Sequence, residues 1–454
     1  MTTTLPHDFE NELKSSIGLE EFQNFIDSFD INIPTSVRIN PIKTKHLPSG
    51  IKIPWCPLGY YLDERPVFTL DPSFHAGSYY VQEASSMFLW NILDQFVHDK
   101  KDIRILDLCA APGGKSTLIA SFLQNMGLLV ANEVIKNRAY VLKYNLSKEG
   151  YSNVIVTNND PRDFSHLPEY FDIILVDAPC SGEGMFRKDS NAICEWSLDN
   201  VDMSASRQKR ILSDVLPSLK SGGMLIYSTC TYNRYENINN IQWLVSEKGL
   251  SSLAVKTEKD WNIVEISEGK SFGYQFFPHK IKGEGFFISV LQNKAEPKSN
   301  LNRKIRTNNS LIAFDKKSLH VFSEWIKLEN KSLLHDKTGT IHAINSNLES
   351  EAFYLIQFLR LIYCGVSVGT VNKTIVIPDH SLALSYLLTD DFQTFELNRL
   401  DALLFLKRTL AAIDSNQKSW ILVTYEGNGL GFLKNLGQRI NNYLPQEYRI
   451  LMDI

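Results

Sequence analysis

Two cysteines stand out as residues that could do chemistry. Cys180 lies in VDAPCSGEG (residues 176–184) and Cys230 lies in YSTCTYNRYEN (residues 227–237), each directly after an apolar run of strand length. A thiolate is a strong carbon nucleophile, and a parallel sheet presents side chains to a ligand at the ends of its strands. A strand-end cysteine seen alone is more often inert packing. Two of them in two such positions predict covalent chemistry.

A glycine-containing segment, LDLCAAPGGKST (residues 106–117), follows another apolar run. Backbone in such a segment can approach a ligand closely, and the start of the next helix can meet a polar or anionic group. The segment is not G-x-G-x-x-G. It also differs from a phosphate loop, because Cys109 stands where that loop needs a glycine, five residues before Gly114. This spacing argues against nucleoside triphosphate binding.

Acidic residues end the next three apolar runs. Glu133 ends the second run, about twenty residues after the glycines, where a carboxylate can accept both ribose hydroxyls of a nucleoside. Asp160 ends the third run and Asp177 the fourth. One such acid is often a helix cap or a turn residue. Three of them in successive strand ends, together with the glycine segment, indicate a nucleoside-binding site.

The elements that must position these residues lie between about residues 100 and 292, where short β-rich runs alternate with helix-length segments. The runs are nearly continuous in apolar residues, as expected for strands buried on both faces of a parallel sheet. They are IRILDL (103–108), GLLVANE (127–133), NVIVTNND (153–160), FDIILVDAP (171–179) and GGMLIYSTC (222–230). The alternation predicts a doubly wound α/β domain. We expect EGFFISVL (284–291) to follow without an intervening helix, as an antiparallel edge strand.

The length of 454 residues predicts more than one domain. A helix over about residues 81–98 is predicted to cover the edge of the sheet, and the polar, Asn- and Lys-rich segment 293–311 reads as a linker. Beyond it we expect strands at 374–378 and 420–425 and helices near 349–361 and 397–412. The predicted division is an N-terminal covering domain (1–95), the α/β domain (96–292), the linker (293–311) and a C-terminal region (312–454).

Composition narrows the class of protein. A net charge of −4 and a pI near 6.2 argue against wholesale electrostatic binding to nucleic acid. The sequence contains no run of about 18 apolar residues, so we expect no membrane span. The polar N-terminus and six cysteines without C-x-x-C spacing favour a soluble protein with reduced thiols in the cytoplasm. We expect a monomer that binds no metal.

The motifs together resemble those of the Nop/Sun family of RNA cytosine-5 methyltransferases, and in particular its bacterial RsmF-like branch. The pairing of Pro-Cys with Thr-Cys is the most specific part of this resemblance, and GNGLGFLKNLGQRINNYLP (427–445) more faintly resembles the branch's RNA-binding extension. The motifs are SVRINPIK (36–43), YYVQEASSM (79–87), LDLCAAPGGK, NEVIKNR, NND, VDAPCSGEGMFRKD, YSTCTYNRYEN and GEGFF. The resemblance implies an α/β, Rossmann-like sheet that uses S-adenosyl-L-methionine, a small N-terminal α+β domain and a C-terminal α+β, PUA-like extension. It also implies that residues 96–292 are catalytic, that residues 312–454 bind RNA and that residues 1–95 bind RNA or cover the catalytic domain.

The resemblance also implies roles for individual residues. Cys230 would attack carbon 6 of cytosine, Cys180 would assist product release, and Asp177 would bind the N3 and amine side of the base. Glu133 would lie on the cofactor's ribose and Asp160 on its adenine. The full implied cofactor site is Cys109, Ala110, Ala111, Pro112, Gly113, Gly114, Lys115, Glu133, Arg138, Asp160 and Asp177.

The substrate implied by the resemblance is RNA. The target base must leave its stack before a thiolate can reach carbon 6. Small-subunit ribosomal RNA is favoured and transfer RNA is the alternative. A noncatalytic cofactor-binding factor in ribosome assembly and a DNA cytosine methyltransferase, in which the Pro-Cys thiol would attack, also stay open. The candidates for contacts to the RNA backbone are Arg38, Lys43, Arg187, Lys188 and Lys434.

Overall fold

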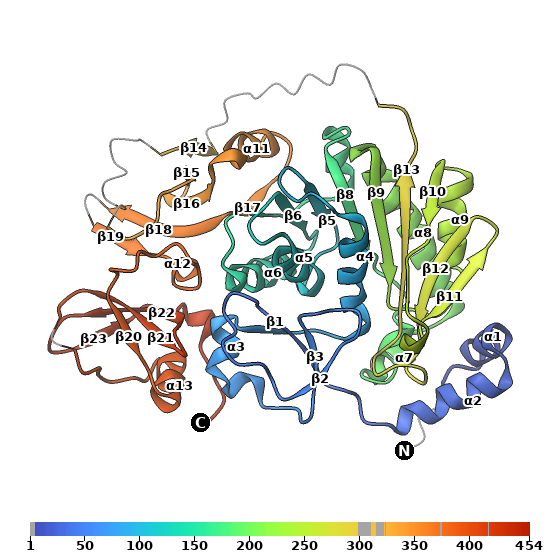
Figure 1. Cartoon of the computed structure of the whole chain (residues 1–454), viewed down its shortest axis with the longest axis horizontal. Coiled ribbons are helices and arrows are strands. Elements are labelled where there is room, and N and C mark those ends of the chain that lie inside the picture. The colour runs from blue at the N-terminus through green and yellow to red at the C-terminus, as the bar shows by residue number, and fades with distance from the viewer. Residues whose placement is uncertain (1–4, 298–309, 315–321, 323, 373–374, 416) are drawn as a thin grey trace.

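The computed structural model describes residues 5–297, 310–314, 322, 324–372, 375–415 and 417–454 (Figure 1). A ten-stranded sheet in the order β11-β12-β13-β9-β8-β5-β6-β7-β17, with β10 paired to β13, runs through the middle of the molecule. Strands β9, β8, β5, β6 and β7 are parallel to one another, which confirms the predicted doubly wound α/β fold. Their bounds are Arg104–Asp107 (β5), Leu128–Asn132 (β6), Val154–Thr157 (β7), Phe171–Asp177 (β8) and Leu219–Thr229 (β9).

Helices cover both faces of this sheet, which is why its central strands are apolar throughout. On one face pack α4 (Phe88–Phe96), α5 (Gly114–Leu123) and α6 (Lys136–Glu149). On the other face pack α8 (Leu198–Val215) and α9 (Ile238–Ser246). Side chains such as Leu118 on α5 and Leu212 on α8 are completely buried. Burial of each such side chain contributes about 1.5–3 kcal/mol. Before α8, α7 (Ser190–Glu195) follows the Cys180 loop.

The antiparallel end of the sheet corrects one prediction. The run at 284–291 forms β13 (Phe286–Asn293), which is antiparallel but lies inside the sheet between β9 and β12. Helix α9 and three further strands precede it, so the expected direct connection is wrong. Two of these strands form a hairpin with Gly269 and Lys270 at its turn. The hairpin contains many polar residues, so it lacks the continuous apolar run from which the other strands were predicted. The three strands are β10 (Leu250–Leu253), β11 (Val264–Glu268) and β12 (Ser271–Phe276).

The opposite edge of the sheet comes from the C-terminal part of the chain. Strand β17 (Leu361–Cys364) pairs antiparallel with β7. Helix α11 (Glu349–Leu355) packs on the same face as α8, and its Glu351 pairs with Arg104 at 2.7 Å. A four-residue strand carries too little periodicity to be recognised in a sequence. The described residues after the predicted linker are therefore partly built into the central sheet; residues 298–309 of that linker lie outside the described part.

The N-terminal part contributes two separate units. Helices α1 (His7–Ile17) and α2 (Leu19–Asp27) pack through Phe9 and Phe25 against Tyr232, which follows Cys230. A four-stranded antiparallel sheet packs against α5, and α3 (Pro72–Ala76) lies beside this sheet (Figure 1). Its strands, in spatial order, are β2 (Gly50–Lys52), β3 (Gly59–Leu62), β1 (Ser36–Ile39) and β4 (Tyr79–Val81).

The C-terminal part forms two further sheets, as Figure 1 shows in orange and red. The first has the order β14-β15-β16-β18-β19 and the second β20-β21-β22-β23. Helices α12 (His380–Ala383) and α13 (Arg399–Lys407) pack beside them. Helices α11 and α13 lie near the two predicted positions, whereas α12 was not predicted. The strands are Leu311–Ala313, Lys331–Asp336, Thr340–Asn345, Val366–Asn372 and Ile375–Pro378 in the first sheet, and Thr394–Glu396, Trp420–Tyr425, Asn428–Asn435 and Ile440–Asn442 in the second. Within the described residues, no helix has the length and apolar content needed to cross a bilayer.

Three of the basic residues expected to contact RNA instead hold the parts of the chain together. The buried Arg38 guanidinium donates to Gln82, Ser121 and Thr117 and so joins the N-terminal sheet to α5. The buried Lys43 ammonium donates to the carbonyls of Ala76, Lys148 and Leu384 at 2.5–2.8 Å. Arg187 is also buried, donating to the Ile31 carbonyl at 3.0 Å and pairing with Glu284 at 3.5 Å. The prediction of RNA contacts at Arg38, Lys43 and Arg187 is therefore wrong.

Candidate active site

The candidate site lies at the carboxyl ends of β5, β8 and β9. The strand order reverses between β5 and β8, and ligands of open α/β sheets bind at such a reversal. Asp107 ends β5, Asp177 ends β8, and Cys230 follows Thr229 at the end of β9. A cavity of about 360 Å³ opens there. It is lined by Tyr80, Val81, Gln82, Glu83, Ser86, Asp107, Cys109, Ala110, Ala111, Pro112, Gly114, Lys115, Asp177, Gly184, Met185, Lys188, Cys230, Glu284, Gly285 and Phe286.

The two cysteines face each other. Their sulfur atoms are 3.1 Å apart, and the Cys230 backbone N–H donates to the Cys180 sulfur at 3.4 Å. Cys230 lines the cavity, whereas Cys180 is not among its lining residues. The hydrogen bond with Cys230, burial and the neighbouring charges of Cys230 and Glu236 raise the pKa of the Cys180 thiol well above its usual range. Cys180 therefore holds its proton as long as Cys230 is free.

Two buried glutamates fix the loops that carry the thiols. Glu183 accepts from the backbone N–H groups of Tyr232 and Asn233 at 2.7 and 3.0 Å. Glu236 accepts from the Ser181 N–H at 3.0 Å and from Gln208 at 2.6 Å. Each glutamate thus ties the Cys180 loop to the segment after Cys230. Glu236 neither caps α9 nor lines the cavity, so its contribution is to hold the two sulfur atoms in register.

A charged pair lies beside Cys230. The Lys115 ammonium is 2.8 Å from Asp177, whose other oxygen accepts from the Ser228 hydroxyl at 2.7 Å. The ammonium also lies 5.0 Å from the centre of the Phe286 ring. Burial lowers the pKa of Lys115, but the charges of Asp177, Asp107 and Cys230 and the hydrogen bond to Asp177 outweigh it, so the pKa is raised. Lys115 stays positive and can stabilise a thiolate at Cys230.

Asp107 is a buried carboxylate that can accept a further hydrogen bond. One of its oxygens accepts from the Ser116 hydroxyl at 2.6 Å, and the other has no hydrogen-bond partner among the described residues. Burial raises the pKa of Asp107, and the negative charges of Asp177 and Glu133 raise it further. The hydrogen bond from Ser116 and the positive charge of Lys115 lower it, but they do not outweigh burial, so the pKa is about 7. A buried acceptor without a partner at a cavity wall fits a ligand that carries a cation.

The glycine segment leads into α5, as predicted. Gly113 precedes the helix with φ of +122°, a conformation that favours glycine. Six of its seven predicted residues line the cavity, Gly113 being the exception. The unpaired N–H groups at the start of a helix attract anionic groups. This end of the cavity thus offers Asp107 for a cation and the start of α5 for an anion.

Three predicted cofactor residues lie outside the cavity lining. Glu133 accepts from the Ile135 N–H at 2.9 Å and lies 3.5 Å from Arg138, which donates to the Ala111 carbonyl at 2.7 Å. Asp160 caps the short helix Pro161–His166 and pairs with Arg162 at 3.0 Å, and this hydrogen bond lowers the pKa of Asp160. These residues stand beside the predicted nucleoside path, and their ribose and adenine roles stay predictions.

The sequence motifs contained further cavity residues to which no role had been given. Tyr80, Gln82 and Glu83 come from the YYVQEASSM motif, and Glu284 comes from GEGFF. The Glu284 side chain is only 5% exposed, and one of its oxygens has no partner among the described residues. Burial raises the pKa of Glu284 against the nearby charges of Lys188 and Arg187. A motif glutamate within apolar residues was the signal in the sequence that could have identified it.

Three successive parts of the chain match models of known protein families. The model of the 16S rRNA methyltransferase RsmB/F matches residues 95–292. The model of the N-terminal domain of 16S rRNA methyltransferase RsmF matches residues 5–84, and that of the methyltransferase RsmF PUA domain matches residues 392–450. The last match confirms the predicted PUA-like extension.

Related bacterial sequences match over most of their length. The ribosomal RNA small subunit methyltransferase F of Shewanella loihica is 32% identical over 411 residues, covering 87% of this chain and 83% of the relative. The protein of the same name from Erwinia tasmaniensis is 30% identical over 453 residues, covering 94% and 93%.

Solved structures share the fold. A methyltransferase homologue from Pyrococcus horikoshii matches with a TM-score of 0.53 and 27% identity, covering 63% of this chain and 94% of its own. NSun6 from the same organism, solved with SFG, matches with a TM-score of 0.54 and 21% identity, covering 65% and 100%. These findings confirm the resemblance drawn from the motifs: the chain belongs to the RsmB/F family of 16S rRNA methyltransferases, in its RsmF branch, and its cofactor is S-adenosyl-L-methionine.

Proposed function

We propose that this chain methylates carbon 5 of cytosine in RNA, with small-subunit ribosomal RNA as its substrate. The observation that carries the proposal is the pair of thiols 3.1 Å apart beside Lys115 and Asp177. Carbon 5 of cytosine is a weak nucleophile, and a thiolate bonded to carbon 6 activates it. The names of the relatives, which are ribosomal RNA small subunit methyltransferases, support the RNA substrate.

The cavity fits the amino-acid end of S-adenosyl-L-methionine. Asp107, with its unpartnered oxygen, would hold the ammonium group, and the start of α5 at Gly114 would hold the carboxylate. Cys109 to Pro112 would contact the cofactor along the same wall. When bound, the cofactor supplies an electrophilic methyl group on a sulfonium. We propose Glu133 for the ribose and Asp160 for the adenine on the grounds of their place after β6 and β7.

Attack begins at Cys230. Its sulfur forms a bond to carbon 6, and the electrons of the 5,6 double bond move to carbon 5, which takes the methyl group. Lys115 supplies a fixed positive charge beside the attacking sulfur, and Asp177 would accept from the exocyclic amine side of the base. Fixed charges of this kind stabilise the charge that develops on the ring and cost no reorganisation during the reaction.

Release requires removal of the proton that remains on carbon 5. Once Cys230 is bonded to carbon 6, it no longer carries a charge, and its contributions to the raised pKa of Cys180 are removed. Cys180 then releases its proton to water more easily, and the resulting thiolate can accept the carbon-5 proton. The electrons of that C–H bond restore the double bond, and the Cys230 sulfur leaves as a thiolate. Cys180 thus becomes a base at the step that needs one.

Cofactor binding is expected to depend on pH through Asp107. Its pKa of about 7 means that the carboxylate needed for the ligand's ammonium is lost as the pH falls through this value. Affinity for S-adenosylhomocysteine, measured by calorimetry, should fall about tenfold between pH 8 and pH 6 because one proton must be released on binding. Asp107→Asn should bind weakly with no such dependence, and the exposed Asp102→Asn should behave as wild type. A wild-type affinity that is equal at both pH values would contradict this role for Asp107.

The proposed reaction is tested by nucleoside mass spectrometry. Purified full chain and S-adenosylmethionine are incubated with unmodified small-subunit ribosomal RNA, with transfer RNA and with DNA of the same sequence as the ribosomal RNA. We expect 5-methylcytidine in the ribosomal RNA alone. 5-Methylcytidine found only in transfer RNA would identify transfer RNA as the substrate instead. 5-Methyldeoxycytidine would favour the DNA alternative. Retention of cofactor with no methylated product in any of the three would indicate a noncatalytic factor.

A further inference from the structure

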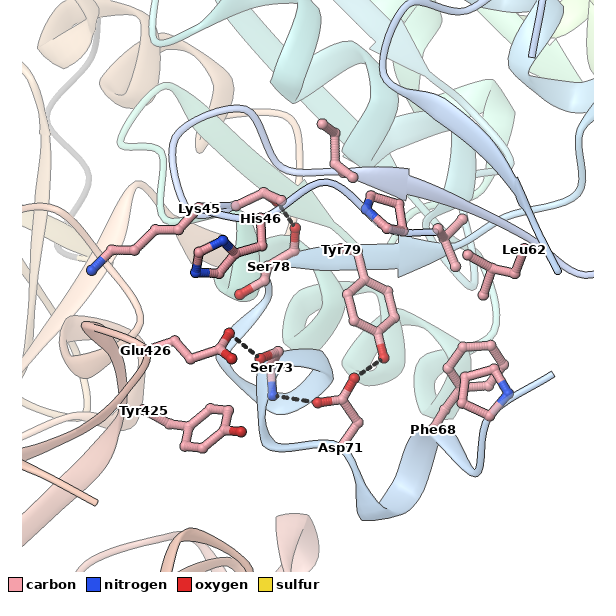
Figure 2. Close-up of a pocket in the computed structure, with 15 residues that line it drawn as sticks. Lys45, His46, Leu62, Phe68, Asp71, Ser73, Ser78, Tyr79, Tyr425 and Glu426 are labelled. Carbon is pink, nitrogen blue, oxygen red and sulfur yellow. Dashed lines mark hydrogen bonds between the residues drawn. The ribbon is translucent and has the colours of Figure 1, made fainter. Parts of the chain in front are cut away.

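A second cavity lies away from the thiols, between the N-terminal sheet and the C-terminal β21–β22 hairpin. Its volume is about 330 Å³, within the range of small-ligand sites. Figure 2 shows Tyr425 and Glu426 of the hairpin on one side, Phe68 on the other, and Tyr79 with Asp71 between them. Two parts of the chain that are about 350 residues apart in sequence therefore build one cavity, and the N-terminal and PUA matches meet there.

Aromatic rings supply the walls. The rings of Phe68 and Tyr79 lie 6.1 Å apart, and Tyr425 faces them from the hairpin. The Tyr79 hydroxyl donates to Asp71 at 2.6 Å, which fixes that ring. Ring faces accept nucleobases by stacking, whatever the base. Phe68 and Tyr79 are tilted by 57° and pack on each other, so a flat ligand would lie against the surface that these rings form and not between them.

Carboxylates and cations both line the cavity. Asp71 accepts from the Ser73 N–H at 2.9 Å, and Glu426 accepts from the Ser73 hydroxyl at 3.0 Å, so both carboxylates are held facing the same region (Figure 2). Lys45 and His46 are exposed at the rim and make no ion pair within the part of the chain that the structure describes. Carboxylates accept from the N–H groups of bases, and cations attract phosphate.

The cavity also adjoins the active site through a single strand. Tyr79 of β4 lines this cavity, while the next residue, Tyr80, lines the cavity with Cys230. Successive side chains of a strand point to opposite sides. A chain of nucleotides that reaches the thiols can thus leave a neighbouring nucleotide on the other side of β4.

We infer that this cavity binds one unstacked nucleotide of the RNA substrate, outside the cytosine that is methylated. The base lies among Phe68, Tyr79 and Tyr425 and donates to Asp71 and Glu426, and Lys45 and His46 contact its phosphate. This inference rests on the proposed RNA substrate. It explains why the N-terminal sheet and the PUA region are held together, since each supplies part of the same nucleotide site.

The test compares RNA binding by full-length variants. Affinity for a fluorescein-labelled fragment of small-subunit ribosomal RNA is measured by anisotropy, with cofactor affinity and thermal unfolding as checks on folding. Tyr425→Ala should weaken RNA binding roughly 5- to 30-fold, and Tyr425→Phe, which keeps the ring, should bind as wild type. Lys45→Ala should weaken binding a few-fold and reduce its salt dependence. Lys52→Ala, an exposed lysine of the same sheet, is the matched control.

The same variants separate this inference from the proposed function. With a substrate that wild type methylates, Tyr425→Ala should raise the KM for RNA and leave kcat and S-adenosylhomocysteine affinity unchanged. If the wild type methylates RNA and Tyr425→Ala has unchanged RNA affinity and KM, the nucleotide site is refuted, and a peptide or small-molecule ligand takes its place. If no RNA is methylated but Tyr425→Ala still loses RNA affinity, the proposed reaction fails and the nucleotide site stands.

Discussion

Cys230→Ala is expected to abolish methyl transfer. Without the sulfur there is no bond to carbon 6, and carbon 5 keeps the low nucleophilicity of an aromatic base carbon. Loss of a covalent nucleophile lowers kcat by roughly 10⁴- to 10⁶-fold in enzymes of comparable design. Lys115 and Asp177 are held by Phe286 and Ser228 and not by Cys230, so the cavity should keep its shape.

The measurement is transfer of labelled methyl groups from the cofactor to RNA at saturating concentrations of both. Cys194→Ala, which removes an exposed thiol, is the matched control and should retain full activity. S-Adenosylhomocysteine should bind to Cys230→Ala with wild-type affinity, which shows that the site is folded. Retention of more than about a tenth of the wild-type kcat by Cys230→Ala would rule out attack by this sulfur.

Cys180→Ala is expected to accumulate a covalent complex between protein and RNA. In the proposed mechanism attack and methyl transfer use Cys230, so both should proceed in this variant. The carbon-5 proton then lacks its acceptor, because alanine replaces the sulfur that lies 3.1 Å from Cys230. General bases contribute about 10²- to 10⁴-fold, so the adduct should persist for that much longer than in wild type.

This adduct is detected as a band of reduced mobility on a denaturing gel. The band should carry both the RNA label and the methyl label, since the block comes after methyl transfer. Wild type and Cys194→Ala should show little of it. The reverse pattern, in which Cys230→Ala accumulates the adduct and Cys180→Ala has neither adduct nor product, would assign attack to Cys180, as in the DNA alternative.

The central sheet and the position of the candidate site at its edge could be predicted from the sequence. Buried parallel strands must be apolar on both faces, so β5 to β9 stood out as continuous runs, and their ends placed Asp177 and Cys230 in one region. Asp107 at the end of β5 was missed, because its unpartnered oxygen at the cavity is visible only in the structure. The motifs then separated the two cysteines. Their contact at 3.1 Å depends on loops 50 residues apart that Glu183 and Glu236 tie together, and no local pattern reveals such a contact.

Other features depend on distant parts of the chain and escaped sequence reasoning. Strand β17 completes the catalytic sheet from about 200 residues further along the chain, where a short run has no distinct period. Arg38 and Lys43 looked like surface cations because their buried partners lie up to 341 residues away. Lys188 and Lys434 remain candidates for RNA contacts: Lys188 lines the active-site cavity, and the Lys434 ammonium lies 5.1 Å from the Trp420 ring.

The proposed roles of the two thiols, attack by Cys230 and release by Cys180, are tested most directly by mapping the adduct of Cys180→Ala. The complex is digested with nuclease and protease, and the modified peptide is sequenced by mass spectrometry. The account predicts a methylated cytidine nucleotide attached to Cys230, and its disappearance in the Cys180→Ala/Cys230→Ala double variant. A nucleotide attached to any other residue, or an adduct that persists in the double variant, would contradict it.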